Sequence, residues 1–138
     1  LSTGGSDMAV ADNKRVLRKW LSALQASDLE TLRSLQSEDC VWTLPGSKKL
    51  PWAGRWKGPA GQKTYLRRIE SAVDFDKQEF KEYIGEGGRI VVTGQEIAKS
   101  KPKGKRWNVS FAWAFTVKRG KITAWEAYEN TAIIAACY

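Results

Sequence analysis

Residues 106–118 constrain the fold most strongly, because large and small side chains alternate along them without interruption. The large set is Val109, Phe111, Trp113, Phe115 and Val117, and the small set is Ser110, Ala112, Ala114 and Thr116. Successive side chains of a strand point to opposite faces of its sheet, and a sheet face in water normally carries polar residues. We therefore predict a strand covered on both faces, with its small face forming the interface of a homodimer.

Apolar residues at helical spacing come before this strand. In residues 9–26, one helix face carries Val16, Leu17, Trp20, Leu21 and Leu24. Ser27 and Glu30 have the spacing of a capping box, which predicts the start of a second helix. Pro59 follows Gly58 and predicts the start of a third helix, since proline favours the first helical position.

The rest of the chain predicts strands separated by turns. We expect one or two helical turns near the C-terminus, a loop or edge segment at 47–61, and strands at 40–44, 75–84, 89–98, 106–118 and 121–129. This order predicts an α+β domain, in which about three helices pack on a strongly bent, mostly antiparallel sheet. Such a sheet forms a cone with an open mouth.

The chain has 138 residues, which suits a single domain. We assign the domain to residues 9–138, and interpret residues 1–8, which are polar and rich in glycine, as a flexible segment or a cloning scar. We expect no signal peptide and no membrane span. Cys40 and Cys137 lie near opposite ends of the chain, which favours two buried thiols in a reducing cytoplasm over a disulfide.

The chain contains no histidine. This excludes Ser-His-Asp catalysis, Cys-His catalysis and metal sites built on imidazole. Two distant cysteines cannot form a zinc site, so we expect no metal and no cofactor. Any acid–base chemistry must use Asp, Glu, Tyr, Lys or bound water.

A net charge of +8 is partly concentrated at residues 99–106, where KSKPKGKR holds five positive residues. This segment is either a solvated hairpin loop, which we favour, or a contact surface for an anionic partner. We do not expect nucleic acid or a membrane to be that partner.

Four segments carry a resemblance to a known superfamily: SALQASDLETLRSLQSEDCVW (22–42), LPWAGRWKGPAG (50–61), YIGEGGRIVVTG (83–94) and GKITAWEAYENTA (120–132). In their order and spacing the chain resembles the nuclear-transport-factor-2-like superfamily, in its SnoaL-like branch. The resemblance implies a cone-shaped fold with a cavity. It implies no single reaction, because this fold supports isomerases, hydrolases, cyclases, dehydratases and binding modules.

The catalytic positions of these relatives are not retained. Leu44 stands where proteins similar to ketosteroid isomerase have their general base, and Phe111 or Ala112 stands where they have an oxyanion-hole Asp. In limonene-epoxide hydrolase and SnoaL-type cyclases, the segment similar to 121–130 ends in a catalytic Asp, whereas here it ends in Asn130. An amide cannot accept a proton, so the resemblance implies the fold and the cavity alone.

We expect any surviving chemistry near Asn130. If Asn130 points into the cone, alternation places Glu126 and Tyr128 on the same face, where desolvation would raise the pKa of Glu126. These three residues form the predicted catalytic group. Three alternatives stay open: a surface ion pair for Glu126, a helix N-cap for Asn130, or a bulge that reverses the alternation. For Glu96 we favour an exposed strand end over an inward position beside Val92 and Gly94.

Aromatic residues predict the walls of a ligand-binding cavity of roughly 300 Å3 or more. The predicted ligand-binding residues, with Arg55 at the rim, are Trp42, Trp52, Arg55, Trp56, Phe80, Phe111 and Trp113. The alternative is that the aromatic side chains fill the cone and leave no cavity.

These patterns favour a cavity protein that binds a small apolar or aromatic metabolite. If it is an enzyme, the predicted type is an isomerase, lyase or hydrolase that uses Glu126 and Tyr128 as acid and base. The alternative is a noncatalytic dimeric interaction module, whose basic hairpin contacts an anionic partner.

Overall fold

A computed structural model describes the backbone of residues 3–138 and the side chains of residues 9–138. The helices are α1 (Thr3–Gln25), α2 (Leu29–Ser34), α3 (Gly58–Ala72) and α4 (Thr131–Ala135). The strands are β1 (Gln36–Leu44), β2 (Gly54–Lys57), β3 (Val73–Glu86), β4 (Arg89–Ser100), β5 (Arg106–Lys118) and β6 (Lys121–Glu129).

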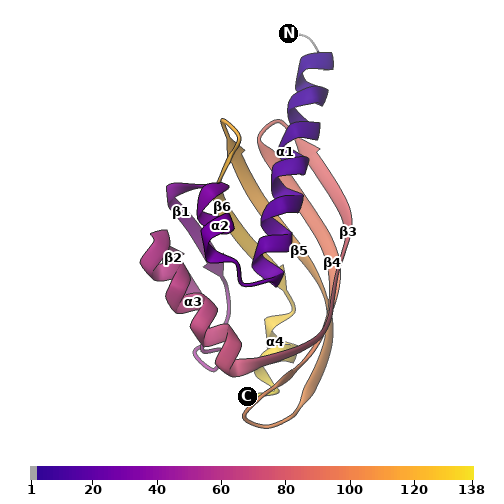
Figure 1. The fold of residues 1–138 in the computed structure, drawn as a ribbon. Coiled ribbons are helices and arrows are strands. Elements are labelled where there is room, and N and C mark those ends of the chain that lie inside the picture. The colour runs from indigo at the N-terminus through magenta and orange to yellow at the C-terminus, as the bar shows by residue number, and fades with distance from the viewer. Residues whose placement is uncertain (1–2) are drawn as a thin grey trace.

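The six strands form one curved, open sheet in the order β2-β1-β6-β5-β4-β3. Every neighbouring pair is antiparallel except β1 and β6, which run parallel. The sheet bends around α1, α2 and α3, which lie on its concave side, and α4 lies at the end of the cone near the C-terminus (Figure 1). The predicted α+β cone is therefore confirmed.

The second helix begins differently from the prediction. Asp28, and not Ser27, is its N-cap, because the Asp28 Oδ1 atom accepts a hydrogen bond from the Thr31 amide at 3.2 Å. Ser27 lies in the turn before it with a φ of 53°. Both residue types cap helices well, so the sequence did not distinguish them. At the first helix, α1 already begins at Thr3, and residues 1–2 of the predicted flexible segment lie outside the described residues.

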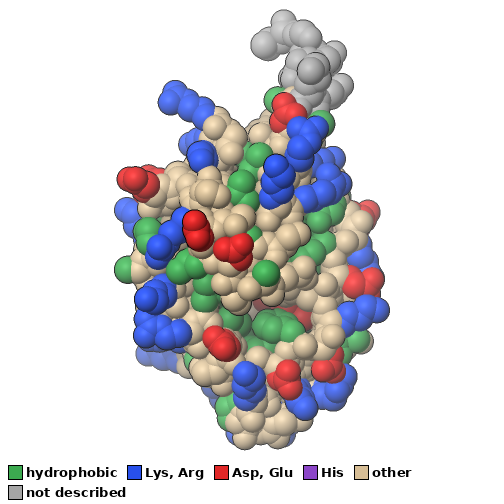
Figure 2. Space-filling view, viewed as in Figure 1, with side chains coloured by type: hydrophobic (Ala, Val, Ile, Leu, Met, Phe, Trp, Pro, Cys, Tyr) green, Lys and Arg blue, Asp and Glu red, His purple; other side chains and the backbone are tan. Residues whose placement is uncertain are grey.

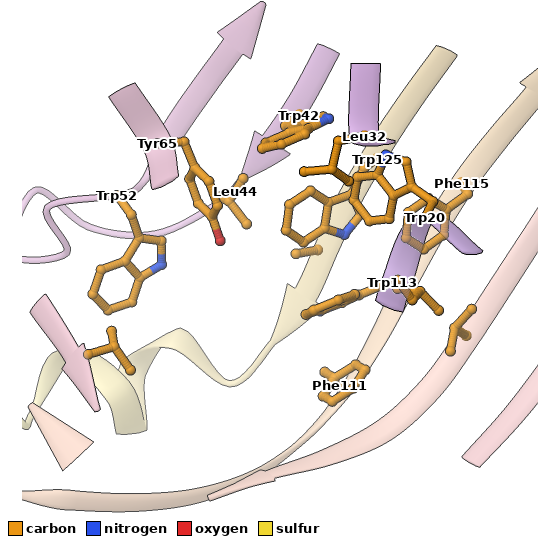
Figure 3. Packing of buried hydrophobic residues seen from close by; sticks show 14 of the residues in the cluster. Trp20, Leu32, Trp42, Leu44, Trp52, Tyr65, Phe111, Trp113, Phe115 and Trp125 are labelled. Carbon is orange, nitrogen blue, oxygen red and sulfur yellow. The ribbon is translucent and has the colours of Figure 1, made fainter. Parts of the chain in front are cut away.

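Trp20 is the centre of the core. It is fully buried and makes edge-to-face contacts with Trp42, Phe115 and Trp125 at ring-centroid distances of 5.6, 5.2 and 5.4 Å (Figure 3). These rings join α1 to β1, β5 and β6. Such aromatic pairs contribute about 0.5–1.5 kcal/mol beyond their buried area, so this cluster fixes α1 against the sheet.

A buried chain of polar groups connects the helices to β1. The Trp20 indole Nε1 donates to the Gln36 Oε1 at 3.0 Å, the Gln36 amide donates to Gln62, and the Gln62 Nε2 donates to the Cys40 carbonyl at 2.9 Å. Because each group has a partner, the buried polar atoms carry little desolvation cost. Cys40 and Cys137 are both buried free thiols, as predicted, and burial raises the pKa of Cys40 to about 12.

Part of the convex face of the sheet carries polar side chains that form hydrogen bonds between neighbouring strands. Ser110 donates to the Gln95 side chain at 2.9 Å, and Thr93 donates to the Glu82 carboxylate at 2.9 Å. On β5, Ala112 and Ala114 lie between Ser110 and Thr116 and pair with Thr93 and Val91 of β4. Over the described helices, none combines the length and the apolar character that a membrane crossing needs.

Candidate functional site

A pocket of about 370 Å3 opens between α3, the end of α1 and the start of β3. Figure 2 shows the hollow, with hydrophobic side chains inside and charged side chains around its mouth. Its exposed rim consists of Gln25, Ser27, Glu70, Phe75, Asp76, Lys77 and Lys101. Its aromatic interior consists of Trp52, Tyr65, Trp107, Trp113 and Trp125, and two carboxylates, Glu96 and Glu129, also line it.

Glu96 projects into the cone from β4. Its side chain is 5% exposed, and its two oxygens accept hydrogen bonds from the Gln78 Nε2 at 3.1 Å and the Trp107 Nε1 at 2.9 Å. Burial raises the pKa of Glu96, and these two hydrogen bonds oppose that change. The prediction of an exposed strand end was wrong, because β4 continues to Ser100 and keeps Glu96 on the same face as Val92.

Glu129 is the last residue of β6 and lies in the same pocket. Its buried Oε2 has no hydrogen-bond partner in the described part of the chain. Burial, followed by repulsion from Glu96, raises the pKa of Glu129 to about 8. Tyr65, on α3, is buried beside them, and burial together with the charges of both carboxylates raises the pKa of its phenol well above the ordinary value.

This arrangement favours one proton on the two carboxyl groups near neutral pH. Two like charges in an apolar site cannot both ionise without a large cost. The two donated hydrogen bonds stabilise the charge on Glu96, whereas the unpartnered oxygen of Glu129 does not stabilise an anion. Glu129 therefore holds the proton, and it can donate that proton to a molecule in the pocket or take it back.

Glu126 and Tyr128 lie on the convex face of the sheet, so the prediction that they enter the cavity was wrong. Glu126 forms an ion pair with Arg89 at 3.3 Å, and the Tyr128 hydroxyl donates to the Glu126 Oε2 at 2.9 Å. Tyr128 is 51% exposed. The alternative of a surface ion pair for Glu126 is the one observed.

The prediction assumed that Asn130 points into the cone, and a β-bulge at the start of β6 sets which side chains of the strand do so instead. Thr116 of β5 pairs with Ala124, but the next residue, Val117, pairs with Ile122, which leaves Thr123 as an extra residue. Ile122 and Trp125 are both buried although they are three positions apart. An extra residue switches the face on which later side chains emerge, so Trp125, Ala127 and Glu129 point into the cone.

Asn130 lies outside the pocket and caps α4. Its side-chain oxygen accepts a hydrogen bond from the Ile133 amide at 3.3 Å. The alternative of an N-cap is therefore observed, and the amide is not placed to take part in chemistry inside the cone.

Of the predicted ligand-binding residues, Trp52 and Trp113 line the pocket. Trp42 belongs to the core around Trp20. The rings of Phe80 and Phe111 pack on each other with their centroids 5.7 Å apart. Both rings contact Trp113, and neither residue lines the pocket. These side chains lie on the expected concave side, but neighbouring rings cover them.

Arg55 and Trp56 belong to the edge strand β2 and do not line the pocket. Trp56 is half-buried, and its indole Nε1 donates to the Trp52 carbonyl at 2.8 Å. This hydrogen bond helps to hold Trp52 at the pocket, whereas Arg55 is exposed to solvent.

Sequence reasoning missed Tyr65, Glu96, Trp107, Trp125 and Glu129 as pocket residues. One signal was available in β6: Trp125 and Glu129 are four positions apart, so any strand that buries Trp125 also buries Glu129.

The basic hairpin at 99–106 is tied to the chain itself. Lys99 and Arg106 form ion pairs with Asp74 and Asp76. The ammonium groups of Lys101 and Lys103 donate to the carbonyl oxygens of Glu70 and Tyr138. Four of the five positive charges therefore have partners within the chain.

Across residues 9–138, no three His, Cys, Asp or Glu side chains gather as metal ligands would.

Comparisons with known proteins agree on the fold. The SnoaL-like domain family matches residues 17–125. A nuclear-transport-factor-2-like protein from Burkholderia xenovorans is 24% identical, with a TM-score of 0.85 over 92% of this chain and 95% of its own. TerC, co-crystallised with polyporic acid, is 23% identical, with a TM-score of 0.81 over 91% and 97% of the two chains. An LEH-like epoxide hydrolase from M. tuberculosis is 23% identical, with a TM-score of 0.68 over 89% of this chain and 86% of its own. No curated protein matches the chain.

Proposed function

Because the chain belongs to the SnoaL-like domain family and carries two carboxylates in the pocket of its cone, we propose that it binds a small, mostly aromatic molecule there and exchanges a proton with it through Glu129. The corresponding activity is that of an isomerase, lyase or hydrolase whose acid–base group belongs to the protein itself.

The observation that carries this proposal is the Glu129 carboxyl group, which lines the pocket and whose buried Oε2 has no hydrogen-bond partner among the described residues. A buried carboxyl group without a partner has its proton available for a ligand. A general acid or base works best when its pKa lies near the working pH, and burial together with Glu96 moves the pKa of Glu129 toward that range.

The walls of the pocket support a flat, apolar ligand. Trp52, Trp107, Trp113 and Trp125 supply apolar indole rings, and Tyr65 adds a phenol close to the carboxylates. The volume of about 370 Å3 lies within the range typical of small-molecule sites. That TerC was crystallised with polyporic acid, and that a hydrolase shares this fold, are consistent with a small-molecule role.

A proton-exchange assay tests the proposal. Phenylacetone carries an acidic C–H group between its carbonyl and its aromatic ring. NMR in heavy water, near the raised pKa of about 8 where Glu129 is partly ionised and can accept that hydrogen, records its exchange for deuterium. We expect the protein to accelerate the exchange and Glu129→Gln to reduce the acceleration by at least about 100-fold, since general acid–base catalysis contributes factors of that size.

Glu126→Gln is the matched control, because it removes a carboxylate three positions away that faces solvent. We expect it to exchange as fast as the wild type. Equal rates for Glu129→Gln and the wild type would reject Glu129 as the acid–base group.

A further inference from the structure

The two carboxylates of the pocket have no positive charge of the protein beside them. Over residues 9–138, neither Glu96 nor Glu129 forms an ion pair. Buried carboxylates normally have a cationic partner, because an isolated charge loses its hydration without compensation. Here one proton is the only available substitute for that partner.

The two lysines at the mouth do not serve this purpose. The Lys77 ammonium group lies 2.9 Å from the Glu79 carboxylate, and the Lys101 ammonium group donates to the Glu70 carbonyl. Both side chains are exposed. The interior of the pocket is therefore acidic, although the chain as a whole carries a charge of +8.

Aromatic rings surround this acidic interior. Trp52, Trp107, Trp113, Trp125 and Tyr65 all line the pocket. The face of an aromatic ring attracts a cation by about 0.5 to 2 kcal/mol, and tryptophan does so most strongly. Aromatic walls and an uncompensated carboxylate pair both favour a positively charged ligand, and both oppose an anion.

We propose that this pocket binds an aromatic amine in its cationic form, with the ammonium group beside Glu96 and Glu129 and the ring against the tryptophan side chains. The inference rests on the proposed function, since it specifies the charge of the ligand in the same pocket. An ammonium group carries three hydrogen-bond donors, and the Glu129 carboxyl group lines the pocket with a buried Oε2 that has no partner among the described residues.

Binding of a cation then displaces the proton of Glu129. The groups that face Glu129 are Glu96 from β4 and Tyr65 from α3, and Glu70, Asp76, Lys77 and Lys101 stand at the mouth. Of these groups, only the carboxylate pair both carries a proton that it can lose near neutral pH and lies beside the proposed position of the ammonium group. Glu129 is consequently ionised in the complex, where it acts as a base.

Three ligands with a shared aromatic ring test the inference: phenethylamine, phenethyl alcohol and phenylacetate. Isothermal titration calorimetry near neutral pH, in two buffers of different ionisation enthalpy, gives both the affinity and the number of protons released. We expect the amine to bind at least about tenfold more tightly than the alcohol, with about one proton released per amine bound. Phenylacetate is expected to bind most weakly.

Variants locate the effect in the pocket. Glu129→Gln and Glu96→Gln should each abolish the preference for the amine and the proton release, while binding of the alcohol shows that the pocket is still folded. Glu126→Gln should behave as the wild type does.

The outcomes separate the two proposals. If the alcohol or phenylacetate binds as tightly as the amine, or the amine releases no proton, the cationic ligand class is overturned and the aromatic pocket stands. If none of the three ligands binds, the proposed function falls together with this inference.

Discussion

The pH dependence of stability is the most direct measure of the carboxylate pair. The ordinary pKa of a glutamate is 4.5, and Glu129 is raised to about 8, first by burial and then by Glu96. Between these two values the folded chain keeps a proton that the unfolded chain has released. The contribution of this proton to the free energy of unfolding is therefore fully present below the lower value. It falls as the pH rises between the two values and is lost once the pH has passed the higher one.

The slope follows from this difference of one bound proton. It amounts to about 1.4 kcal/mol for each pH unit, so the interval allows a total loss of up to about 5 kcal/mol. Water that enters the pocket lowers the cost of the ionised form, and we expect about 2 to 4 kcal/mol in practice. Such a loss is a large fraction of the stability of a small domain.

Glu129→Gln removes the titrating group and keeps its shape. Urea unfolding of the variant and the wild type, followed by circular dichroism from about pH 5 to about pH 9, gives a difference that cancels the other titrating groups. The variant should gain on the wild type as the pH rises, by the 2 to 4 kcal/mol estimated above. Glu126→Gln should give a flat difference, because an exposed ion pair contributes about 0 to 1 kcal/mol. A flat difference for Glu129→Gln as well would show that Glu129 is not a buried acid, and the reasoning behind the site would be refuted.

Two further predictions concern the core and the convex face. Gln62→Ala should lower the free energy of unfolding, measured in urea, by about 2 to 4 kcal/mol, because it leaves the Gln36 amide and the Cys40 carbonyl without partners in the interior. Gln95→Ala, on the convex face, is the matched control. A similar loss of stability in both variants would contradict a special role for the buried chain of polar groups. Sedimentation velocity at tens of micromolar should detect a homodimer formed through the convex face, and Ala112→Arg should convert it to a monomer; a monomeric wild type across moderate salt would rule out the dimer.

The fold could be predicted from the sequence because its signals are local and repeated. The apolar face around Trp20 and Leu21 predicted α1, Pro59 marked the start of α3, and the alternation of 106–118 matches β5. Most of these patterns extend over several residues, so misplacing an element's boundary by one position does not change the predicted element. The N-cap at Asp28 was missed because its neighbour Ser27 has the same capping chemistry.

The site depended on a single backbone irregularity that leaves no local trace. Counting by twos along β6 from Ile122 gives one face, and counting from Trp125 gives the other, and both faces contain apolar residues and a glutamate. Only the pairing with β5 shows that Thr123 is an extra residue. The raised pKa of Glu129 likewise depends on Glu96, thirty-three positions earlier, and no motif connects the two.

The bulge at Thr123 also determines how such a site can change over time. Deleting one residue from this part of β6 would rotate the remainder of the strand by half a turn relative to its neighbours. Glu126 and Tyr128 would then enter the cone, and Glu129 would face water, without any substitution. A change of one residue in the length of β6 can therefore replace Glu129 by Glu126 as the candidate acid of this pocket. Relatives of this fold would gain new chemistry by this route without a substitution, and a comparison of aligned residue types would overlook it.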